Sequence, residues 1–148
     1  MKNINFILIL FIVACVVLVS CEKMVTSPNM PATYDDRPVK DQGTVYVSDR
    51  DVSLKIWDNG IVDGDIISLV VNDKLVLSNY GLSGYGNKKE IDLKFDNDGY
   101  NYILLFINDS GSVLSDTTAL TIDDGTGEQD MFLTSDLTYC GAISVYVQ

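Results

Sequence analysis

Alternation of apolar and polar residues is the feature that most constrains this chain, and it runs from Gly43 to the C-terminus. The clearest examples are residues 52–57, 91–95 and 143–147, where apolar side chains occupy every second position. Because successive side chains of a strand point to opposite faces, this pattern predicts strands that bury one face. Residues 100–107 are apolar nearly throughout, which predicts a central strand buried on both faces.

Short turn-forming segments separate these stretches, among them Asp58-Asn59-Gly60, Asn97-Asp98-Gly99 and Asn72-Asp73-Lys74, the last of which predicts a hairpin turn. Glycine and asparagine adopt positive φ at little cost. About seven to eight short strands, with no amphipathic helix, predict an all-β fold, an immunoglobulin-like β-sandwich over residues 44–148. A barrel is the alternative architecture.

The N-terminus has the pattern of a signal peptide. Lys2 precedes 14 residues, Phe6 to Val19, that are apolar apart from Cys15, and the run ends in Leu18-Val19-Ser20-Cys21. This segment resembles the lipobox signal peptides of bacterial lipoproteins. The resemblance implies a signal peptide helix over residues 1–20, cleavage before Cys21, and acylation of Cys21 with palmitate-type chains that hold the protein on a membrane. An uncleaved anchor or a buried helix is the alternative.

Residues 21–43 contain all three prolines of the chain and show neither helical nor strand periodicity. Such a composition is typical of an extended, flexible linker. We therefore expect three parts: a signal peptide over residues 1–20, a lipid-anchored linker over residues 21–43, and the β-domain over residues 44–148. The location expected is the cell envelope, with the outer membrane favoured and the face, periplasmic or external, left open.

Part of the β-domain carries a second resemblance. Residues 58–69 (DNGIVDGDIISL), 101–111 (NYILLFINDSG) and 117–125 (TTALTIDDG) resemble a small β-sandwich domain that recurs in secreted proteins and lipoproteins of Gram-negative bacteria. The match covers about half of the chain. It departs from the family pattern at Asn72-Asp73, where Asn-Gly is usual. The resemblance implies a fold, and we associate no fixed enzymatic activity with such domains.

The charge of the chain argues against nucleic acid as a partner. Acidic residues number 21 and basic residues 10, so that the net charge is −11. Proteins that bind a phosphate backbone need clustered Lys and Arg.

The residue types also argue against an enzyme. Histidine is absent, and with it the commonest general base. Cys140 is the one cysteine outside the leader and Cys21; with no histidine to activate it, it is expected to be a buried core thiol.

Three aspartates are the candidate metal ligands. Asp58, Asp63 and Asp65 lie within eight positions, and calcium prefers several oxygen ligands from one tight loop. The simpler interpretation is that Asp-Gly pairs build turns. Asp96-Asn97-Asp98-Gly99 begins like a calcium loop but lacks a third acidic position and the closing glutamate. No cofactor is expected beyond the lipid on Cys21, with calcium as the conditional exception.

Trp57, Tyr80 and Tyr85 are the candidate binding residues, because aromatic rings at strand ends and in loops stack on sugars or anchor protein partners. Core filling and cross-strand pairing are the alternative roles.

The sequence therefore predicts a non-enzymatic, lipid-anchored envelope protein whose β-sandwich presents a binding surface. The expected partners are membrane lipid, through acylated Cys21, and an envelope protein or a glycan. A small glycan-binding module and a calcium-stiffened adhesion domain are the alternatives.

Overall fold

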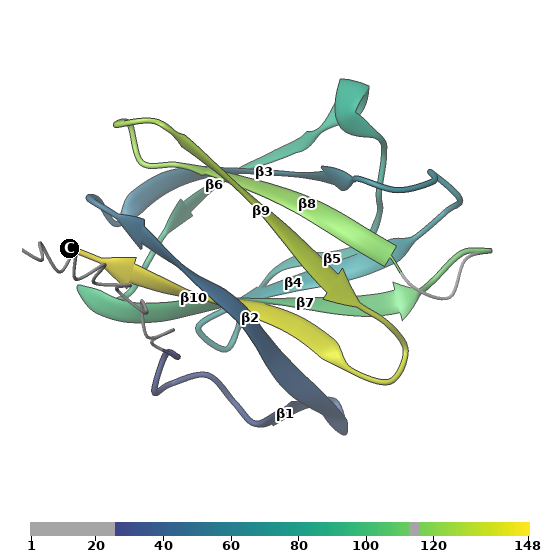
Figure 1. Cartoon of the computed structure of the whole chain (residues 1–148), viewed down its shortest axis with the longest axis horizontal. Coiled ribbons are helices and arrows are strands. Elements are labelled where there is room, and N and C mark those ends of the chain that lie inside the picture. Colours follow the sequence, from purple (N-terminus) through teal and green to yellow (C-terminus); the bar gives the residue numbers. More distant parts are fainter. Residues whose placement is uncertain (1–25, 113–115) are drawn as a thin grey trace, which may run out of the picture.

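The computed structural model describes residues 26–112 and 116–148, which form two β-sheets (Figure 1). The six-stranded sheet has the order β1 (Thr33–Tyr34), β2 (Arg37–Val47), β10 (Cys140–Val147), β7 (Gly99–Asp109), β4 (Ile66–Val71) and β5 (Lys74–Gly81). The four-stranded sheet has the order β6 (Lys89–Lys94), β3 (Asp51–Asp58), β8 (Asp116–Asp123) and β9 (Glu128–Ser135). A short 3₁₀ turn, η1, spans Tyr85–Asn87. The predicted signal peptide and Cys21 lie outside the described residues.

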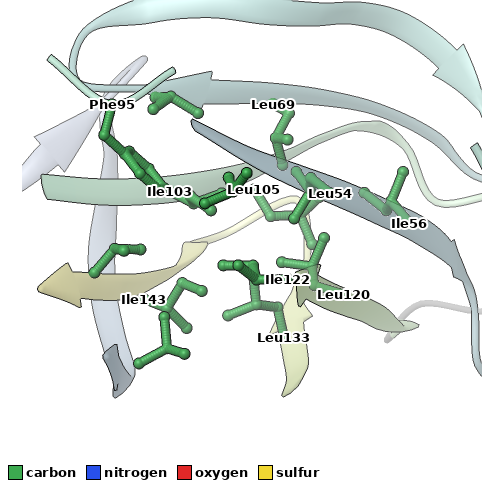
Figure 2. Close-up of a cluster of buried hydrophobic side chains, with 14 of the residues drawn as sticks. Leu54, Ile56, Leu69, Phe95, Ile103, Leu105, Leu120, Ile122, Leu133 and Ile143 are labelled. Atoms are coloured by element: carbon green, nitrogen blue, oxygen red, sulfur yellow. The ribbon is translucent and has the colours of Figure 1, made fainter. Parts of the chain in front are cut away.

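One apolar core fills the space between the two sheets. Figure 2 shows side chains of both sheets pointing into it, and the members are fully or almost fully buried. The four-stranded sheet contributes Leu54, Ile56 and Leu120, and the six-stranded sheet contributes Leu69 and Ile103. The prediction of an all-β fold built from strands with one buried face is confirmed.

Strand β7 is central, as predicted. It pairs with β10 on one side and β4 on the other. Its alternate residues face two separate clusters: Ile103 and Leu105 belong to the core between the sheets, whereas Tyr102, Leu104 and Phe106 belong to a cluster on the outer face of the six-stranded sheet.

The segment that covers this outer face is the described part, residues 26–43, of the linker predicted over residues 21–43, and in this part the prediction is corrected. Met30, Tyr34 and Val39 pack on the outer cluster, and the ring of Tyr34 meets that of Phe106 edge-on at 5.6 Å. Strands β1 and β2 begin at Thr33 and Arg37, so the β-domain begins well before residue 44. The sequence did not indicate this early start because proline is unusual in strands. Pro38 has no N–H to pair, yet it fits near the start of a strand.

The described residues form ten strands, more than the seven to eight expected. Part of the difference arises because β1 and the start of β2 lie in residues 21–43, which were predicted to be a linker. β7 and β10 are neighbours, although the β8–β9 hairpin between them in sequence belongs to the other sheet. β2 pairs with β10 in parallel.

The β4–β5 hairpin lies where the sequence predicted it, but its loop is one residue shorter than the predicted turn, because Lys74 already belongs to β5. Val71 pairs with Lys74, and the two loop residues have positive φ, 46° at Asn72 and 65° at Asp73. Two such residues in a two-residue loop define a type I′ turn, whose twist matches the strands.

The domain has two distinct ends. Ile66, which begins β4, lies opposite Asp109, whereas Val71, which ends β4, lies opposite Ile103. Residues 59–65, 82–87 and 110–112 therefore share one end, called the loop end. The hairpin at residues 72–73 lies at the other, called the hairpin end. Asn29 lines a surface hollow with Asn72 and Asp73, so the described chain enters the domain at the hairpin end. In Figure 1 the described chain begins and ends on the left, and the loop after β3 is on the right.

Candidate functional site

The three predicted aspartates converge at the loop end. Asp58 is the last residue of β3, and Asp63 and Asp65 lie in the loop that leads to β4. Each residue has one carboxylate oxygen within 4.8 Å of those of the other two. Asp58 is 4% exposed and Asp65 is fully buried. The structure thus brings together all three residues that the sequence singled out.

The inward position of Asp58 follows from strand parity. Val52, Leu54 and Ile56 of β3 face the core between the sheets, and Asp58 is the next residue on that face. The Gly60 N–H donates to Asp58 Oδ1 at 2.6 Å, a local turn that agrees with the turn-forming interpretation. The Asp58 N–H donates to the carbonyl of Ser83 at 2.9 Å, which holds the strand end against the 82–87 loop.

Asp63 is held by the loop after β7, a partner that the sequence did not suggest. The backbone N–H and the hydroxyl of Ser112 both donate to Asp63 Oδ2, at 2.7 and 2.9 Å. Gly111 makes this approach possible, since its φ is +58° and a Cβ there would lie 2.8 Å from the carbonyl oxygen of Asp63.

The predicted aromatic residues are placed very differently from one another. Tyr85 is 71% exposed, whereas Trp57 is 4% exposed although it points away from the core. Trp57 is covered by Tyr85, which meets it in a T-shaped arrangement with ring centroids 5.7 Å apart, and by the ammonium group of Lys88, 3.9 Å from the indole centroid. Tyr80 is half-buried, with Lys89 5.9 Å from its ring.

Two exposed aliphatic residues that the sequence did not single out lie beside Tyr85. Ile61 and Val62 are 71% and 57% exposed, and a Cβ at Gly84 would lie 3.0 Å from Val62, so the two loops touch. The signal was available in the sequence: Ile61 and Val62, the two residues between Gly60 and Asp63, are both apolar although they lie among turn-forming residues. We call Ile61, Val62 and Tyr85 the apolar rim.

The second acidic segment, residues 96–99, forms ion pairs instead of a shared site. Lys74 donates to Asp96 Oδ1 at 2.6 Å, and this hydrogen bond lowers the pKa of Asp96 below its usual value. Asp98 lies 3.8 Å from Arg50.

Cys140 is fully buried, as predicted. Burial raises the pKa of its thiol to about 11, which keeps it protonated and unreactive at neutral pH.

Comparisons with protein-family models, with curated proteins and with solved structures gave no significant match. In the part of the chain that the structure describes, no helix is long and apolar enough to cross a membrane.

Proposed function

We propose that the chain is a non-enzymatic, lipid-anchored protein of the bacterial cell envelope whose immunoglobulin-like β-sandwich presents the apolar rim to a protein partner. The observation that carries the proposal is the polarity of the domain. The described chain enters at the hairpin end, next to Asn72 and Asp73, and the apolar rim lies at the loop end. A tether that starts at acylated Cys21 would leave the rim facing away from the lipid.

The chemistry of the rim favours a protein over a glycan. Sugar recognition needs a flat aromatic face with polar groups beside it, yet the indole face of Trp57 is covered by Lys88. The buried core of a protein interface is more apolar than the rest of the surface and is enriched in tyrosine, which fits two exposed aliphatic side chains next to Tyr85.

The anchor is tested with the Cys21→Ser variant. The parent chain is expected to enter the detergent phase and to incorporate labelled palmitate, and the variant is expected to do neither. Equal labelling and partitioning of the two chains would contradict the anchor.

The rim is tested by crosslinking in intact envelopes followed by capture of the chain. A partner is expected with the parent, lost with Ile61→Asp, and kept with Leu75→Asp. Leu75 is the matched control, because it is 55% exposed and lies near the hairpin end. If Ile61→Asp captures the same partner as the parent, or the parent captures none reproducibly, the rim is not the binding surface. A glycan array that binds the parent and not Tyr85→Ala would favour the glycan-binding alternative instead.

A further inference from the structure

We propose that the carboxylates of Asp58, Asp63 and Asp65, together with the hydroxyl of Thr118, bind a calcium ion at the loop end. This inference is independent of the anchor and of any partner at the apolar rim. It depends on how the protein stabilises its buried acidic groups.

The three carboxylates lie close enough together to repel one another when they are charged. Three carboxylates approach within 4.8 Å of one another, and two of them are almost completely removed from water. Buried charges are normally paired with opposite charges or coordinate metals. None of the ion pairs among the described residues includes Asp58.

One carboxylate oxygen of Asp58 has no hydrogen-bond partner among the described residues. Oδ1 accepts the Gly60 N–H, but Oδ2 is buried and receives no hydrogen bond from any described residue. A buried, unsatisfied carboxylate oxygen costs free energy unless another ligand, such as a cation, satisfies it.

A second oxygen without a hydrogen-bond partner among the described residues lies on the neighbouring strand. Thr118 of β8 lies directly opposite Asp58 in the β3–β8 ladder, and directly opposite residues of an antiparallel pair project from the same face. Thr118 is fully buried, and its Oγ1 makes no hydrogen bond within the described residues. Two unpartnered oxygens on the same face, one a hydroxyl and one a carboxylate oxygen, are suited to bind one cation together.

The ligand set selects the ion. All four groups offer oxygen, and the chain contains no histidine, so softer transition metals are disfavoured. Calcium binds six to eight oxygens at about 2.4 Å, so two of its ligands lie at most about 4.8 Å apart. Magnesium requires near-ideal octahedral geometry at about 2.1 Å and usually keeps several waters instead of entering an all-protein cage, so a largely buried set of protein oxygens favours calcium.

The position of the ion predicts what it does. Asp58 and Thr118 belong to the four-stranded sheet, whereas Asp65 directly precedes β4 of the six-stranded sheet. Asp63 adds the loop after β7 through Ser112. An ion at this place links both sheets and two loops, so it binds the folded chain in preference to the unfolded one and stabilises it.

The first experiment uses the full chain, freed of metal with EDTA and kept in detergent. Addition of 2 mM CaCl₂ is expected to raise Tm by about 5 °C or more, and the same concentration of MgCl₂ is expected to raise it by less than half as much. Terbium is the direct probe: excitation of Trp57, the single tryptophan and the sequence neighbour of Asp58, is expected to sensitise terbium emission that calcium abolishes.

The second experiment uses variants. Asp58→Asn keeps the shape of the side chain and an oxygen for the Gly60 N–H, and it is expected to lose the calcium-induced shift in Tm and the terbium emission. Thr118→Val is expected to weaken calcium binding about tenfold. Asp98→Asn is the matched control, because this aspartate lies in the exposed acidic segment at the hairpin end, and it is expected to respond like the parent.

Three results would overturn the proposal. The first is that the parent shows neither a shift in Tm nor terbium emission displaced by calcium. The second is that Asp58→Asn keeps the full response, and the third is that magnesium raises Tm as much as calcium does. The first and third results come from the parent chain, so they decide the question even if a variant does not fold.

Discussion

Tyr102 illustrates how much one residue contributes to this fold. Its ring lies in the outer cluster on the six-stranded sheet, and its hydroxyl reaches the type I′ hairpin, where it donates to Asp73 Oδ1 and accepts the Asp73 N–H, both at 2.8 Å. We expect Tyr102→Phe to lower the free energy of unfolding by about 1–2 kcal/mol, because Asp73 loses both bonds. Urea denaturation measures this, with Tyr100→Phe as the control. An unchanged midpoint for Tyr102→Phe would show that the hydroxyl is dispensable.

The same residue predicts a dependence on alkaline pH. Burial, followed by the hydrogen bond with Asp73, raises the pKa of Tyr102 to about 12 from an ordinary value of 10. The folded state therefore keeps a proton that the unfolded state releases. Its contribution to stability is complete below pH 10 and is lost as the pH rises through 12. Denaturation at pH 9 and pH 11.5 is expected to show a smaller loss of stability in Tyr102→Phe than in the parent.

At the scale of elements, the segment before β2 is part of the folded domain. Tyr34 of β1 packs on Phe106 of β7, and the Val39 N–H donates to the Ala32 carbonyl at 3.0 Å. We expect Tyr34→Ala to lower the free energy of unfolding by about 1–2 kcal/mol, since it uncovers the outer cluster. Thr33→Ala, an exposed neighbour, should leave stability nearly unchanged. Equal stability of the two variants would show that this segment is a linker and does not stabilise the folded domain.

A second feature at this scale is the close approach of β9 to the six-stranded sheet. The side-chain amide of Gln42 in β2 donates to the Thr134 carbonyl at 2.6 Å and accepts the Thr134 N–H at 2.9 Å, in place of a neighbouring strand. A Cβ at Gly141 would lie 2.3 Å from that carbonyl oxygen. Gly141→Ala is expected to lower stability by about 2 kcal/mol or more in thermal unfolding. Gly86→Ala, which has open space around it, serves as the control and should melt like the parent.

At the scale of the whole molecule, both sheets share one core. Leu54 and Ile103 come from opposite sheets and are both fully buried in the same cluster (Figure 2). We therefore expect Leu54→Ala and Ile103→Ala each to cost about 2–5 kcal/mol and each to shift one cooperative transition. Circular dichroism and Trp57 fluorescence should report the same midpoint. Two separate transitions would show that the sheets unfold independently.

The sequence predicted elements better than it predicted their neighbours. The alternation at residues 52–57 placed β3, and the two turn residues Asn72 and Asp73 placed the β4–β5 hairpin. The start of β2 was missed because Pro38 and the polar residues around it carry no period of two. The parallel pairing of β2 with β10 joins segments about a hundred residues apart, and nothing local in either segment indicates it.

The candidate site divides in the same way. Asp58, Asp63 and Asp65 were found from the sequence because they lie within eight positions of one another. Thr118 was not, because its place opposite Asp58 depends on the register between β3 and β8. The cover over Trp57 was also missed, since Lys88 reaches it from another loop.

By itself, the sequence determined which residues form strands, which form turns, and that three aspartates lie close together, because these properties depend on neighbours a few positions away. Only the tertiary structure decided which strands pair, where the domain begins, which face of Trp57 is covered, and which oxygens are left buried without partners. These depend on contacts between distant segments, whose register is selected by the burial of the shared core and not by any local pattern.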